Sequence, residues 1–143
     1  MLNLDQAKHA IGKISHLVNQ SSIYRTAAWG RTDQPDFYNQ IIKVETVLEP
    51  DALLNAILSF EEALGRVREE KWGPRIIDID ILFYGERIVQ TENLVVPHPG
   101  IASRRFVLEP LNEIDPLFIH PVLKKNMITL LNECVDELEV ERI

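Results

Sequence analysis

Cysteine is nearly absent from this 143-residue chain, since Cys134 is its only one. A single cysteine excludes an intrachain disulfide and is typical of proteins in a reducing compartment. The chain also lacks a run of about 18 apolar residues, which argues against a transmembrane helix, and it shows no basic-then-apolar leader. We therefore expect a cytoplasmic protein without a membrane partner, in which Cys134 packs in a helix and is not a nucleophile.

Positive charge is also in the minority. The chain has 15 Lys and Arg against 22 Asp and Glu, which gives a net charge of −7. A basic footprint of the kind that binds nucleic acid is therefore lacking, and we expect no nucleic-acid partner. The 45% hydrophobic and 26% charged content is ordinary for a globular protein. The length predicts one domain over residues 1–143, large enough for a real core.

The apolar pattern changes period along the chain. Apolar residues recur at helical spacing in some segments and alternate with polar residues in others. Gly65 is placed to end the second helix. A mixture of this kind predicts an α+β fold with a mainly antiparallel sheet. We expect helices over residues 4–18, 50–64, 103–112 and 126–137, strands over 21–25, 39–48 and 76–84, and loops over 26–36 and 66–75.

Two carboxylates interrupt the apolar strand predicted over residues 76–84. Asp78 and Asp80 are two residues apart, so in a strand both side chains point to one face, about 7 Å apart. Two ionised carboxylates in an apolar surrounding require cations. Mg²⁺ is a natural partner, because it prefers carboxylate oxygens together with phosphate oxygens. The pair predicts a metal site.

Four basic residues precede this pair. Arg66, Arg68, Lys71 and Arg75 lie within ten residues of an otherwise acidic chain. They are either a solvated loop or a clamp for phosphate groups. Because the cluster is local, it favours a small polyanionic ligand over a polymer. Pro74 stiffens the backbone before Arg75, which supports the clamp.

Other interpretations of the aspartate pair remain open. The two acids are either paired with neighbouring arginines at a sheet edge or used in a metal-dependent phosphatase with Asp78 as its nucleophile. The phosphatase motif requires Thr or Val after the pair, where this chain has Ile81. A phosphatase would also have no reason for four nearby cations.

Several stretches of the chain stand out together. The string from Trp72 to Leu82 holds the aspartates, and the others are residues 21–26, 33–39, 64–68 and 96–99, then Arg104 and residues 106–111. In this order they resemble the signatures of the 6-hydroxymethyl-7,8-dihydropterin pyrophosphokinase family, with the string from Trp72 to Leu82 as the strongest match. A set of separate motifs in order is far more specific than any single motif, and the match runs over nearly the whole chain.

This resemblance implies a ferredoxin-like core and transfer of a diphosphoryl group from ATP to a pterin hydroxymethyl group, with AMP as the other product. It implies two Mg²⁺ at Asp78 and Asp80, and catalytic roles for these two residues with Arg66 and Arg75. The substrates are then ATP and a hydroxymethyldihydropterin. The ATP phosphates are expected to contact Arg66, Arg68, Lys71, Arg75, His98 and Arg104, although Lys71 stands where relatives often have Arg.

Three aromatic residues near the loops have two interpretations. Phe37, Trp72 and Phe106 either pack in the core or stack on a flat heterocycle such as a pterin. Asn39 offers the donors and the acceptor that match a pterin amide edge. The resemblance adds backbone groups of Thr26, Ala27 and Trp29 to that edge, while Ala27-Ala28 replaces a Pro-Pro that is frequent in the family.

The family normally opens with a strand that ends in a Gly-Ser-Asn turn, followed by its first helix. This sequence begins with what resembles that helix, so the first strand is absent. We expect residues upstream of Met1, or another way of filling the gap, and a monomer or a strand-swapped dimer. An impaired relative that binds pterin and nucleotide is the alternative function. No general base is evident, although Asp80 is a candidate acceptor of the hydroxyl proton.

Overall fold

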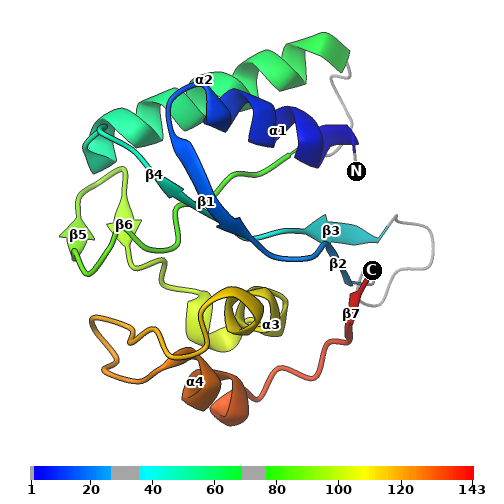
Figure 1. Ribbon diagram of the computed structural model, residues 1–143, viewed down its shortest axis with the longest axis vertical. Coiled ribbons are helices and arrows are strands. Elements are labelled where there is room, and N and C mark those ends of the chain that lie inside the picture. Colours follow the sequence, from blue (N-terminus) through cyan, green and yellow to red (C-terminus); the bar gives the residue numbers. More distant parts are fainter. Residues whose placement is uncertain (1, 27–35, 69–76) are drawn as a thin grey trace.

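The computed structural model of the chain describes residues 2–26, 36–68 and 77–143. Antiparallel strands lie in a middle layer, with α1 and α2 on one side and α3 and α4 on the other (Figure 1). The α+β class is therefore confirmed. The elements are α1 (Leu2–Gly12), β1 (His16–Gln20), β2 (Tyr24–Thr26), β3 (Phe37–Asn39), β4 (Ile42–Glu45), α2 (Pro50–Arg68), β5 (Val89–Gln90), β6 (Val95–Val96), the short 3-10 helix η1 (Ile101–Ser103), α3 (Arg105–Ile114), α4 (Met127–Glu133) and β7 (Val140–Arg142).

The strands of the described residues form three small sheets. β1 pairs with β4, β2 lies between β3 and β7, and β5 pairs with β6, in each case antiparallel. In β4, Ile42 and Val44 are half-buried while Lys43 and Glu45 are exposed. This alternation is the one that the sequence predicts for a strand with one covered face.

Several predicted boundaries are wrong. The helix predicted over 4–18 ends at Gly12, because residues 16–20 pair with β4 and a ladder replaces the helical hydrogen bonds. The strand predicted over 39–48 is divided into β3 and β4. The strand predicted over 21–25 begins later, at Tyr24.

Two helix ends also differ from the prediction. Gly65 does not end α2, which continues to Arg68. A side chain at Gly65 would meet no atom of the described residues within 4 Å, so nothing in that part of the structure requires a glycine there. The helix predicted over 126–137 ends at Glu133, where the chain turns toward β2 and forms β7.

The segment that carries the aspartates is not a strand over its described residues, 77–84, contrary to the prediction. The segment makes single hydrogen bonds to separate parts of the chain in place of the regular hydrogen bonds of a paired strand. Ile79 N–H donates to the Glu61 carboxylate of α2, the Tyr84 hydroxyl donates to Leu48 O, and Leu82 O accepts from His98 N–H. The segment therefore has an extended character without strand pairing.

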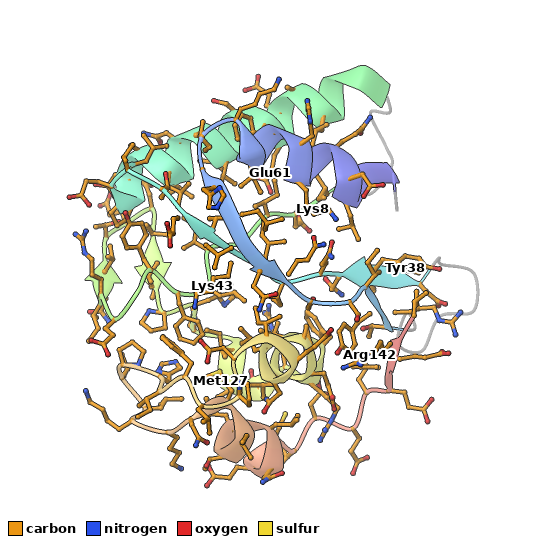
Figure 2. All side chains as sticks on the ribbon, in the orientation of Figure 1. Lys8, Tyr38, Lys43, Glu61, Met127 and Arg142 are labelled. Atoms are coloured by element: carbon orange, nitrogen blue, oxygen red, sulfur yellow. The ribbon has the colours of Figure 1, made fainter. Side chains whose placement is uncertain are left out.

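The main core lies between α3 and α4. Figure 2 places Met127, the first residue of α4, beside α3, and both Met127 and Leu108 are fully buried. The buried cluster consists of Ile101, Val107, Leu108, Leu111, Met127 and Leu130.

Among the described helices, none combines the length and the apolar character that a membrane span requires.

Leu108→Ala is expected to lower the free energy of unfolding by roughly 2–5 kcal/mol, because it opens a cavity around a side chain that is 0% exposed. Leu117→Ala is the matched control, since Leu117 is 69% exposed and its truncation leaves no cavity. Urea unfolding followed by circular dichroism measures both. Equal losses in the two variants would contradict this assignment of the core.

Candidate active site

The two aspartates lie on the solvent side of an extended segment. Asp78 and Asp80 are exposed, and the isoleucines on either side, Ile77, Ile79 and Ile81, are half-buried. A period of two along the chain places both carboxylates on one face, as the sequence predicts. The hydrogen bond from Ile79 N–H to Glu61 Oε2, 2.7 Å long, fixes the backbone between them against α2 (Figure 2).

This pair suits a metal ion that arrives with a polyphosphate. Within residues 2–26, 36–68 and 77–143, no group of three or more His, Cys, Asp or Glu side chains is arranged to hold a metal. Mg²⁺ is commonly bound by one or two carboxylates together with substrate phosphates and water. The donor set of Asp78 and Asp80 fits that mode and does not form a complete cage.

His98 is attached directly to the aspartate segment. Its backbone N–H donates to Leu82 O at 2.9 Å, two residues after Asp80. Its ring Nδ1 accepts the N–H of Gly100 at 3.0 Å. Because Nδ1 is used as an acceptor, Nε2 is the ring nitrogen that can donate to an anion.

Arg104 lies against the same turn. A Cβ built on Gly100 would be 2.9 Å from Arg104 Cζ and 3.3 Å from His98 Cε1, so the absence of a side chain at Gly100 lets these two groups come close. The exposed Arg104 guanidinium also lies 5.9 Å from the Phe106 ring centroid, within cation–π range. His98 and Arg104 are therefore brought together, as a phosphate site requires.

The β2–β3 hairpin carries the predicted pterin contacts. In its register Thr26 is opposite Phe37, and Asn39 is opposite Tyr24. Thr26 is 2% exposed, whereas Phe37 is 58% exposed. Phe37 is therefore not a core residue, and its ring is available to a ligand. Phe106, in contrast, packs partly against the buried cluster of α3.

Two buried polar atoms of this region have no hydrogen-bond partner among the described residues, Thr26 Oγ1 and Gln40 Oε1. An unpaired buried polar group costs about 1–3 kcal/mol, so such groups need an explanation. A ligand with hydrogen-bond donors would supply one. Gln40 is not among the site residues predicted from the sequence, where the only signal for it is its place next to Asn39.

Helix α3 connects the β2–β3 hairpin, the aspartate segment and the His98 turn. Ile41 follows the hairpin, Leu82 follows the aspartates, and Phe106 follows the His98 turn, and all three pack against the same buried cluster. In Figure 1, α3 lies at the centre of the layer opposite α1 and α2. The hairpin, the aspartate segment and the His98 turn are thus attached to one helix.

Other predicted site residues fall outside this description. Arg66 and Arg68 lie in the last turn of α2, and their side chains are not described. The predicted loops over 26–36 and 66–75 lie mostly outside the described residues. Outside them also lie Ala27, Trp29, Lys71, Trp72 and Arg75.

The fold is that of a known class of α+β protein. A crystal structure of Plasmodium falciparum HPPK-DHPS superimposes with a TM-score of 0.67 at 19% sequence identity, over 91% of this chain and 39% of that one. The similarity shows a shared α+β fold, and it agrees with the ferredoxin-like core that the family resemblance implies.

Sequence comparison identifies the family. The family model described as 7,8-dihydro-6-hydroxymethylpterin-pyrophosphokinase (HPPK) matches residues 1–116, and the chain belongs to this family. The proteins from Methylorubrum extorquens and Haemophilus influenzae named 2-amino-4-hydroxy-6-hydroxymethyldihydropteridine pyrophosphokinase are 48% and 45% identical to it. Each alignment covers 78% of this chain, with 76% and 71% of the respective relative. A protein of the same name from Synechocystis is 38% identical over 91% of this chain and 69% of its own length.

Thr26→Val is expected to leave the free energy of unfolding unchanged or to raise it, because it removes a buried hydroxyl that has no partner among the described residues and keeps the shape of the side chain. Thr46→Val is the matched control. The Thr46 hydroxyl donates to Ile14 O at 3.0 Å and accepts from Leu48 N–H at 3.2 Å, so its removal should cost about 1 kcal/mol. Thermal unfolding compares the variants, and a clear loss in Thr26→Val would show that its hydroxyl is satisfied in the free protein.

Proposed function

We propose that the chain transfers a diphosphoryl group from ATP to the hydroxymethyl group of 6-hydroxymethyl-7,8-dihydropterin, giving AMP and the pterin diphosphate. The observation that carries the proposal is the family match over residues 1–116, which includes the exposed pair Asp78 and Asp80. Membership of a pyrophosphokinase family argues against the Asp-dependent phosphatase considered from the sequence.

Asp78 and Asp80 would hold the metal, with two Mg²⁺ as the expected number. When bound, Mg²⁺ neutralises charge on the phosphate oxygens that builds up as the diphosphoryl group is transferred. The protein contributes by holding the two metal-binding carboxylates in place. Glu61 holds the backbone between the two aspartates, so their carboxylates share one face before the nucleotide arrives.

The turn that contains His98 and Arg104 would bind phosphate oxygens. Nε2 of His98 donates one hydrogen bond, and the planar guanidinium of Arg104 offers a forked pair of donors. Because His98 N–H is bonded to Leu82 O, this anion site is fixed relative to the aspartates. Roles for Arg66, Arg68, Lys71 and Arg75 in holding the triphosphate remain predictions.

The hairpin would bind the pterin. A pterin carries an amino group and ring N–H groups, which are the donors that the buried Gln40 Oε1 lacks, and Thr26 Oγ1 can accept or donate. Asn39 completes an edge of mixed donors and acceptors. The exposed Phe37 ring offers a stacking surface, and roles for Phe106, Trp72, Ala27 and Trp29 remain predictions. Asp80 stays a candidate acceptor of the substrate's hydroxyl proton.

Incubation of the protein with ATP, Mg²⁺ and the hydroxymethyldihydropterin is expected to give AMP in amounts equal to the pterin diphosphate. Separation of the nucleotides by anion-exchange chromatography measures this. Stoichiometric ADP would instead assign the chain to kinases that transfer a single phosphoryl group. Binding of both substrates without any product would favour the impaired relative.

Asp78→Asn and Asp80→Asn are each expected to lower turnover more than tenfold, which corresponds to a barrier increase above about 1.4 kcal/mol, because each removes a metal ligand. Asp5→Asn is the control, since Asp5 is an exposed surface acid on α1. Initial rates of AMP formation at several Mg²⁺ concentrations compare the three. Retention of most activity in either site variant would show that the metal assignment is wrong.

A further inference from the structure

The C-terminal segment lies beyond the family match, which ends at residue 116. Its strand β7 lies along β2 on the side away from β3 (Figure 1). The pairing sets Thr26 opposite Val140 and Tyr24 opposite Arg142, and Ile143 N–H donates to Ile23 O at 2.9 Å. The strand that leads to the pterin residues is therefore held by the last residues of the chain.

A polar cluster connects this sheet to the end of α3. The Tyr24 hydroxyl donates to Glu113 Oε1 at 2.8 Å. The backbone N–H and the hydroxyl of Ser22 donate to the two oxygens of the same carboxylate at 2.9 and 2.8 Å. Glu113 thus accepts three hydrogen bonds from residues 22–24, which fixes the start of β2 on α3.

Arg142 closes the cluster from β7 (Figure 2). Its Nε donates to the Tyr24 hydroxyl at 3.2 Å, and a second nitrogen lies 3.7 Å from Glu113 Oε1. Its guanidinium carbon is 5.7 Å from the Tyr24 ring centroid, within cation–π range. Arg142 therefore contacts both other members of the cluster.

The charges of the cluster set the direction of its hydrogen bonds. Burial by itself would raise the pKa of Glu113, but the hydrogen bonds from Tyr24 and Ser22 and the charge of Arg142 outweigh it and lower that pKa. Burial, followed by the bond to Glu113, raises the pKa of Tyr24. Near neutral pH, Glu113 is therefore an ionised acceptor and Tyr24 a protonated donor.

The C-terminal segment is attached to α3 a second time. Arg105, the first residue of α3, donates from its N–H to Asp136 Oδ2 at 3.1 Å and from Nε to Asp136 O at 3.0 Å. Residues 134–143 thus run from the first turn of α3 to its last. The segment spans the distance between the Arg104 turn and the hairpin.

We propose that Tyr24, Glu113 and Arg142 are positioning residues for pterin binding, which hold β2 on α3 so that Thr26 and Asn39 keep their relative geometry. Asn39 is the partner of Tyr24 across β3, and Thr26 is the partner of Val140 across β7. Asn39 is therefore paired directly with a residue of the cluster, and Thr26 lies two residues from Tyr24 on the same strand. This inference rests on the proposed function.

Arg142→Ala tests it, with Arg87→Ala as a matched control. Arg87 has the same kinds of contact elsewhere, an ion pair with Glu49 at 2.6 Å and a position 5.4 Å from the Tyr84 ring centroid. Calorimetry measures two dissociation constants for each variant. The first is the Kd of α,β-methylene-ATP, and the second is the Kd of the pterin with α,β-methylene-ATP already bound. Arg142→Ala should weaken pterin binding by about fivefold or more and leave nucleotide binding within about twofold. Arg87→Ala should change neither by more than about twofold.

Tyr24→Phe gives a second test that keeps the ring and removes the hydroxyl shared by the cluster. It should shift the pterin Kd in the same direction, with the nucleotide Kd preserved at a temperature well below its melting point. Hydrogen exchange of residues 24–26 and 37–39 should quicken in Arg142→Ala and not in Arg87→Ala. If Arg142→Ala does not fold, Tyr24→Phe decides the question.

Equal effects on both ligands, or no effect of either cluster variant on the pterin Kd, would overturn the positioning role. The wild-type protein separates this failure from that of the proposed function. A wild type that binds the pterin and forms AMP, beside cluster variants that match Arg87→Ala, overturns only the positioning role. A wild type that binds no pterin overturns the proposed function and the inference that rests on it.

Discussion

Burial of α3 is the constraint on which the rest of the structure depends. Leu108, fully buried at its centre, packs against Met127 of α4, and Ile41 and Leu82 pack against the same cluster from the strand side. Removing this apolar surface from water is the main source of stability, at about 25 cal/mol for each Å² buried. Because Ile41 follows the hairpin and Leu82 follows the aspartates, the same burial fixes the two halves of the candidate site relative to each other.

Two buried polar atoms of the candidate site lower the stability of the folded protein. Thr26 Oγ1 and Gln40 Oε1 are buried without partners among the described residues, and a flexible hairpin would relieve that cost by turning them to solvent. The ladder to β7 and the carboxylate of Glu113 keep β2 in place. A buried polar group without a partner is costly, so these two atoms stay buried only because the pairing and the hydrogen bonds of β2 hold the hairpin in place.

The sequence predicted local features better than distant partners. The alternation at Ile42, Lys43 and Val44 indicated a strand correctly, and the spacing of Asp78 and Asp80 indicated a shared face, because both depend only on a period of two. The helix predicted through Val18 was wrong, since pairing with β4 decides that segment and its apolar residues suit either structure. The strand predicted around the aspartates kept its alternation but has no ladder in the described residues, because pairing depends on a neighbour that the local pattern does not specify.

The polar cluster shows the same limit most clearly. Tyr24 and Glu113 are separated by 89 residues and Tyr24 and Arg142 by 118, so no spacing rule relates them. Each was unremarkable alone, a tyrosine in a strand, a glutamate near a helix end and an arginine near the C-terminus. They come together because α3 places Glu113 about 12 Å from Arg105 along its axis. The C-terminal segment contacts the helix at both of these residues. A helix that is fixed by its core can carry such contacts without moving, which is why one buried apolar face organises both ends of the candidate site.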